Sequence, residues 1–192
     1  MVLDTNSRIS LSNNDGGTSN TIFGKQIGTI DAGSNYNVFI GHQVASAGTL
    51  NNVLNTVAIG TESLKNLTSA DSSTFVGSGA GLQVTTGSSN TGIGRWTQYS
   101  NATGTNNTSL GAKAMQGVSG NNHSNNTAIG SLSMLSITTG DDNTAVGKNS
   151  AFSNTTGSNN SAIGFDSLLY NQTGNNNVSI GYESMQGISG QS

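Results

Sequence analysis

An apolar residue followed by glycine recurs at regular intervals along almost the whole chain. The spacings between these glycines run 17, 19, 17, 17, 17, 19, 17, 17 and 17 residues. Repeats of this length are shorter than those of helical-pair solenoids and are typical of single coils of a β-solenoid or β-roll. The pattern therefore predicts an all-β fold, a repetitive parallel β-roll or β-solenoid of about ten coils of 17–19 residues. The structural repeat glycines are Gly24, Gly41, Gly60, Gly77, Gly94, Gly111, Gly130, Gly147, Gly164 and Gly181.

The three residues before each glycine predict a short strand. The first is Thr, Val or Ser, the second is mostly small, and the third is apolar in every repeat. Because alternate side chains of a strand point to opposite faces, the first and third residues share one face. We interpret the third residues as a row that faces either the core of the coil or the axis of a trimer: Phe23, Ile40, Ile59, Val76, Ile93, Leu110, Ile129, Val146, Ile163 and Ile180.

Asparagine occupies the position four residues before the glycine in eight of the ten repeats. Thr56 and Ser73 stand there in the other two. In stacked coils these amides could bond to one another as a ladder, but asparagine also tolerates a tight turn, and both interpretations stay open. The candidate ladder residues are Asn20, Asn37, Asn90, Asn107, Asn126, Asn143, Asn160 and Asn177.

A second apolar row follows each glycine, with a small residue three positions on and one or two larger apolar residues after it. Ser133, Met134 and Leu135 are an example. The pattern does not distinguish a strand from a single helical turn. A Thr-Thr-Gly or similar turn then closes the coil, with glycine at 87, 104, 140, 157 and 174.

The composition argues against an enzyme. Gly, Asn, Ser and Thr together make up 106 of the 192 residues, charged residues only 8%, and the chain has two histidines and no cysteine. We find no paired carboxylates, metal-ligand spacing or phosphate-binding loop, and expect no catalytic residue, no metal and no cofactor. So few cations exclude a basic stripe for nucleic acid, and no apolar run is long enough to span a membrane.

A coil with about three sizeable apolar residues is too thin to be stable alone, which predicts an obligate oligomer. Three chains form the smallest ring that closes around a central axis. Ten coils at ~4.8 Å predict a shaft of roughly 50 Å. Residues 1–17 do not fit the repeat and are expected to be an N-terminal cap or attachment segment, with residues 18–192 as the shaft.

Two motifs resemble the head repeats of trimeric autotransporter adhesins: Asn126-Thr127-Ala128-Ile129-Gly130 and Val178-Ser179-Ile180-Gly181. The 17-residue form with its Thr-Thr-Gly turn is even more similar to repeats of phage tail-fibre proteins. This resemblance implies a homotrimeric, left-handed β-roll whose strand row faces the trimer axis. It implies a virion structural protein, a tail-fibre shaft that acts in host attachment together with other virion or fibre proteins.

The first residues lack the basic flank and apolar stretch of a secretory signal. We therefore expect synthesis in the cytoplasm and a final location in the virion tail fibre or an extracellular appendage. Candidate contacts to a host-surface glycan are Trp96, Tyr99, Tyr170 and Tyr182, which could instead fill gaps between chains.

Alternative functions are a self-assembling extracellular filament, an adhesin head, and an ice-binding β-solenoid. Ice binding would use the threonines three residues before the glycine, at 21, 74, 91, 108, 127 and 144. We expect these threonines to point inward, toward the core, which argues against that function.

Overall fold

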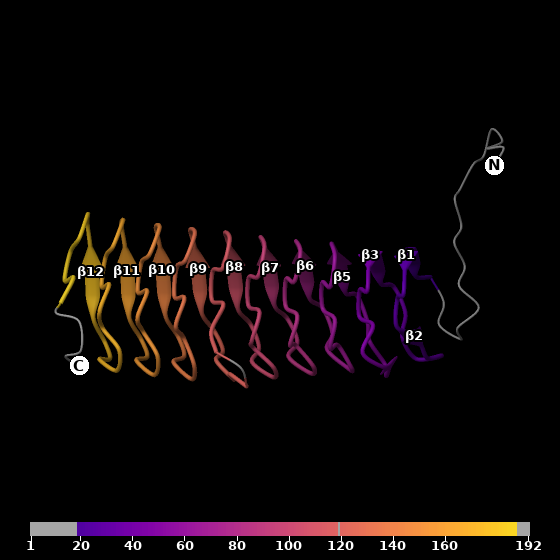
Figure 1. Ribbon diagram of the computed structural model, residues 1–192. Coiled ribbons are helices and arrows are strands. Elements are labelled where there is room, and N and C mark those ends of the chain that lie inside the picture. The colour runs from indigo at the N-terminus through magenta and orange to yellow at the C-terminus, as the bar shows by residue number, and fades with distance from the viewer. Residues whose placement is uncertain (1–18, 119, 188–192) are drawn as a thin grey trace.

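A parallel sheet with one strand from each coil runs along the chain (Figure 1). The computed structural model describes residues 19–118 and 120–187, which contain strands and turns but no helix. The ten strands of this sheet follow chain order. They are β1 (Thr21–Lys25), β3 (Val38–His42), β5 (Val57–Ile59), β6 (Thr74–Val76), β7 (Thr91–Ile93), β8 (Thr108–Leu110), β9 (Thr127–Ile129), β10 (Thr144–Val146), β11 (Ser161–Ile163) and β12 (Val178–Ile180). In the first two coils, β2 (Thr29–Ile30) and β4 (Thr49–Leu50) form a separate parallel pair.

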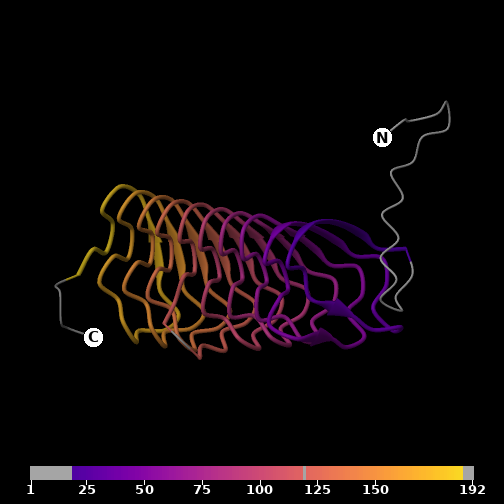
Figure 2. The same cartoon turned by 45° about the vertical axis from the view of Figure 1, so that its right-hand side comes forward.

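Each strand pairs with the equivalent residues of the next coil, so the sequence repeat and the structural repeat coincide. Between β9 and β10, Thr127 lies opposite Thr144 and Ile129 opposite Val146. Figure 2 shows the coils stacked one behind another along the whole shaft. The predicted all-β solenoid is confirmed. The expected cap at residues 1–17 lies outside the described residues.

The 19-residue spacing does not disturb the strand register. Val38 pairs with Val57, 19 residues further on. The backbone amide of Asn51, in contrast, donates to the carbonyl of Thr68, which is 17 residues further on. The two extra residues of this coil are therefore accommodated between these points, away from the ten-stranded sheet.

The core of the coil is formed by the middle residue of each strand and by apolar residues of the following turn. Middle residues such as Ala58, Phe75 and Ala145 are fully buried, and so are the turn residues Leu64 and Met134. Since side chains alternate along a strand, a buried middle residue requires its two neighbours to point out of the coil.

The row that we interpret as a core or trimer-axis row lies on the outer face of the coil, which corrects the core interpretation, whereas the trimer-axis interpretation stays a prediction. Phe23 is 64% exposed and Ile180 65% exposed, while Ile59 and Val146 are half-buried. The physical reason is the narrow interior of the coil, which takes Ala, Gly or Ser at most middle positions. The small middle residue, rather than the larger flanking ones, marks the side that faces the core.

Phe75 shows how little room the interior leaves. A Cβ atom on Gly92, the middle residue of the next strand, would lie 2.6 Å from the Phe75 ring, and one on Gly81 would lie 2.8 Å from it. The large ring therefore fits because both neighbouring positions carry no side chain.

The second apolar row is neither a strand nor a helical turn. In this part of each coil the backbone adopts the left-handed conformation at the second and fourth residues after the repeat glycine. Leu132 (φ 63°) and Met134 (φ 49°) are examples. Non-glycine residues adopt this conformation at some cost, and here the burial of residues such as Met134 compensates for it.

The repeat glycines occupy the corner where each strand ends. Gly60 has φ +129°, and a Cβ atom there would lie 2.6 Å from the carbonyl oxygen of Gly77 in the next coil. Both the backbone angle and the close stacking of coils therefore require glycine, which explains the regular recurrence of this residue.

Candidate functional site

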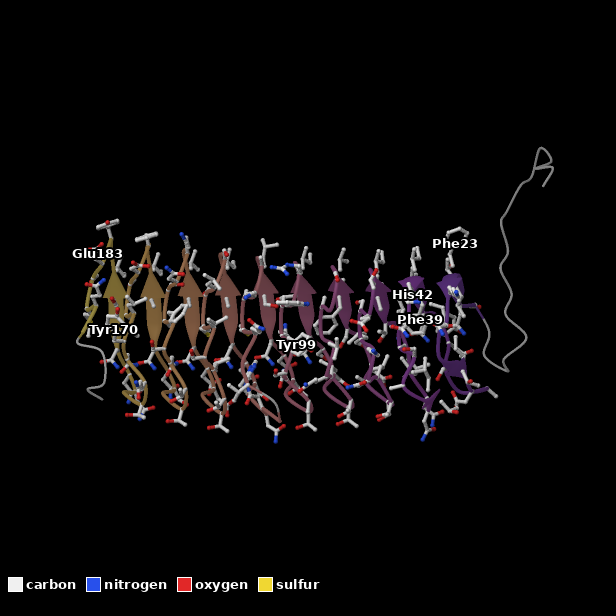
Figure 3. All side chains as sticks on the ribbon, viewed as in Figure 1. Phe23, Phe39, His42, Tyr99, Tyr170 and Glu183 are labelled. Atoms are coloured by element: carbon white, nitrogen blue, oxygen red, sulfur yellow. The ribbon has the colours of Figure 1, made fainter. Side chains whose placement is uncertain are left out.

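An exposed apolar column runs along the outer face of the ten-stranded sheet. It consists of the ten residues that directly precede the repeat glycines, from Phe23 in β1 to Ile180 in β12. Its most exposed members are Phe23, Ile93, Leu110, Ile129, Ile163 and Ile180. Phe23 lies at the upper edge of the sheet in Figure 3. A continuous apolar surface of this kind is typical of an interaction face.

A threonine column flanks the apolar column on the same outer face. It consists of the residues three positions before the repeat glycines, and threonine occupies it without interruption from Thr74 to Thr144. Thr108 and Thr144 are exposed, and Thr91 and Thr127 are half-buried. The expectation that these threonines point inward was wrong, for the same reason as the core assignment.

The asparagines form a hydrogen-bonded ladder inside the coils. From Asn107 to Asn177, each side-chain Nδ2 donates to the Oδ1 of the asparagine in the preceding coil, at 2.9–3.3 Å, and Asn90 is the first acceptor. The same amides also bind the closing turn, as when Asn126 Nδ2 donates to the carbonyl of Gly140 at 2.9 Å. Ladder and turn, which the sequence left as alternatives, occur together.

The ladder changes chemistry in the N-terminal coils. Asn37 donates its backbone amide to Asn20 Oδ1 at 2.9 Å, and Thr56 donates its own to Asn37 Oδ1 at 2.9 Å. Thr56 and Ser73 place hydroxyl groups where the other coils have side-chain amides. The Ser73 Oγ accepts from the backbone amide of Asn90 at 3.2 Å.

We expect Asn143→Ala to lower the free energy of unfolding by about 2 kcal/mol, the usual cost of one orphaned buried donor. Asn143 Oδ1 accepts from the backbone amide and from Nδ2 of Asn160. The Asn160 backbone amide would lose its partner, whereas the carbonyl of Gly157 would still accept from Asn154 Nδ2 at 2.9 Å. Urea unfolding followed by circular dichroism measures the change.

Asn66→Ala is the matched control, because Asn66 is half-buried but lies outside the ladder. It should change stability by less than about 0.5 kcal/mol, as is usual for surface substitutions. Equal losses in the two variants would contradict a stabilising role of the ladder.

The candidate glycan-contact residues fall into separate groups. Trp96 and Tyr99 lie together, edge to face, with ring centroids 6.2 Å apart. Tyr182 stacks on Phe165 one coil away at 5.4 Å, and Tyr170 belongs to neither group. Figure 3 shows Tyr99 and Tyr170 on coils far apart along the shaft.

Sequence reasoning missed the cations that cover these rings. The Arg95 guanidinium lies 4.3 Å and the Lys113 ammonium 5.3 Å from the Trp96 ring centroid. Lys148 Nζ lies 5.7 Å from the Phe165 ring centroid. The repeat register held the signal: Trp96 and Lys113 both stand two residues after a repeat glycine, so they lie in adjacent coils.

The titratable groups are dispersed. His42 is exposed and bonds to Gln26, whereas His123 is fully buried, and burial lowers its pKa to about 4. The Glu62 carboxylate pairs with Lys65 at 2.7 Å. A hydrogen bond to Glu183 raises the pKa of Tyr182. Across residues 19–118 and 120–187 no three His, Cys, Asp or Glu side chains gather closely enough to hold a metal ion.

Comparisons with known proteins identify no relative of this chain. No family model, no curated protein and no solved structure matches the chain. In the part of the chain that the structure describes, no helix is long and apolar enough to cross a membrane.

Proposed function

We propose that the chain is a structural and adhesive fibre segment, a homotrimeric β-solenoid shaft of the phage tail-fibre type. Its role is to hold or present surfaces for host attachment, next to other virion or fibre proteins, in the virion tail fibre or a comparable extracellular appendage. The observation that supports this proposal is the exposed apolar column along the outer face of the sheet.

The apolar column supports association because its members recur at every coil. Leu110 and Ile129, for example, lie opposite each other in adjacent strands, and both are exposed. A straight row of this kind can pack against the same row of identical chains that run in the same direction. Three copies around one axis bury all three rows together, and closed cyclic symmetry ends the assembly at that number.

The measurement is the mass of the full chain in solution, by light scattering coupled to size exclusion. We expect three times the chain mass of 19.4 kDa. The double variant Ile129→Asp/Ile163→Asp should shift the mass toward the single chain, because it places charges in the buried row. Ser131→Asp, exposed and outside the apolar column, should leave the trimer intact. A well-folded wild-type monomer would contradict the proposal.

Ice binding is a second candidate, which the outward threonine column favours. The row from Thr74 to Thr144 beside apolar side chains presents regularly spaced hydroxyl and methyl groups to water. The two functions compete for one face, since a trimer that buries the apolar column also covers the threonines. A wild-type monomer with thermal hysteresis would support ice binding, and fibres of indefinite length in electron micrographs would support a filament.

A further inference from the structure

A cluster of two cations and two aromatic rings lies outside the ten-stranded sheet, in the turns that follow β7 and β8. Arg95, Trp96 and Tyr99 come from one coil, and Lys113 comes from the next. Both cations lie over the same ring, at 4.3 Å and 5.3 Å from the Trp96 centroid. Tyr99 meets that ring edge to face. We call these four residues the tryptophan cluster.

The preceding coil provides space for the Trp96 ring. Gly79 occupies the position equivalent to Trp96 one coil earlier, and a Cβ atom there would lie 2.5 Å from Trp96 Cδ1. In all of the remaining repeats the equivalent position carries a side chain. The ring is therefore held close to the coil at this one place along the shaft, and cation–aromatic contacts restrict both cations at the same time.

The positive charge of the tryptophan cluster is uncompensated. No acidic residue lies between Asp71 and Asp141 in the sequence. Among the described residues the salt bridge joins Lys65 and Glu62, so neither cation of the cluster has an ion-pair partner there. The second cation–aromatic group differs, because Asp166 and Glu183 directly follow its rings Phe165 and Tyr182.

We infer that the tryptophan cluster binds an acidic saccharide, with a carboxylate on Arg95 and Lys113 and a sugar C–H surface against the aromatic rings. Guanidinium and ammonium groups bind carboxylates by charge-assisted hydrogen bonds, which are the stronger class. Aromatic side chains supply apolar contact to the C–H groups of a sugar ring. The inference deepens the adhesive function proposed above, and it rests on that function for its biological use.

Trp96 is the sole tryptophan of the chain, so its fluorescence reports on this site alone. The probes are pentagalacturonate, its fully methyl-esterified form, and inorganic phosphate, each titrated into the full chain. We expect a saturable change with pentagalacturonate that weakens as salt is raised, since exposed charges are screened. The ester and phosphate should bind at least about tenfold more weakly, because each lacks one of the two recognised features.

The double variant Arg95→Gln/Lys113→Gln should weaken pentagalacturonate binding by at least about tenfold. Lys148→Gln is the matched control, because it removes the other cation that lies over an aromatic ring, and it should bind as the wild type does. Binding of the ester with equal affinity, equal binding of phosphate, or no effect of the double variant would each overturn the inference. The mass of the same sample reports the trimer separately, so failure of one proposal is distinguishable from failure of the other.

Discussion

Replacement of Gly60 by alanine should lower the free energy of unfolding by about 4 kcal/mol, from backbone strain and steric overlap together. Alanine rarely adopts φ +129°, and its Cβ would lie 2.6 Å from the carbonyl oxygen and 2.7 Å from the carbonyl carbon of Gly77. Both are backbone atoms of the neighbouring coil, so relief requires two coils to move apart. That movement would stretch the hydrogen bond from the Gly77 amide to the Ile59 carbonyl, now 2.8 Å.

The measurement is urea unfolding by circular dichroism at one fixed protein concentration, since oligomer stability depends on concentration. Gly48→Ala is the matched control: a Cβ there has nothing within 4 Å, and its φ is not positive. That control should be neutral or stabilise by up to about 1 kcal/mol through lower entropy of the unfolded chain. Equal stability of Gly60→Ala and wild type would contradict the role assigned to the corner glycines.

Acidification from pH 6.5 to pH 4 should remove about 3 kcal/mol of stability through His123 alone. The imidazole is fully buried, Nε2 has no hydrogen-bond partner, and Nδ1 lies 3.4 Å from Asn107 Oδ1. Burial, with no contribution from a charged neighbour, lowers the pKa from 6.5 to about 4. Below pH 6.5 the unfolded chain binds a proton that the folded chain does not, so stability falls with pH until about pH 4.

Urea unfolding at several pH values between 4 and 7 measures this loss. His123→Val should lack this part of the pH dependence, and valine suits the position because Val53 is buried at the equivalent place in the other 19-residue coil. His42→Gln should keep it, because His42 is exposed. A His123→Val variant with the full wild-type pH profile would show that another group causes the loss.

The register between adjacent coils explains which contacts can be predicted from the sequence. In a solenoid, residues one repeat apart lie in adjacent coils, so the asparagine ladder follows from the recurrence of Asn90, Asn107 and Asn126 at equivalent positions. The contact between Lys113 and Trp96 obeys the same rule. Each repeat on its own carries no sign of it, because the contact joins two repeats and becomes visible only when equivalent positions of adjacent repeats are compared.

The burial of His123 and the left-handed turns could not be predicted from the sequence, because both depend on the conformation of the folded coil. The buried state of His123 could not be predicted from its neighbours in the chain, since the other coils carry Gly, Ser or a small apolar residue at that position. The left-handed turns at Leu132 and Met134 carry residue types that ordinarily avoid positive φ, so no local signal predicted them.

The sequence by itself determined the coil: its length, its parallel stacking, the glycine corners and the asparagine positions, because each depends on spacing that recurs along the chain. Only the tertiary structure decided which side of each strand faces inward. Alternation allows either face to be buried, and the choice came from the width of the closed coil, which accepts Ala128 and excludes Ile129. That choice leaves the apolar and threonine columns on the outside, where they are available to bind.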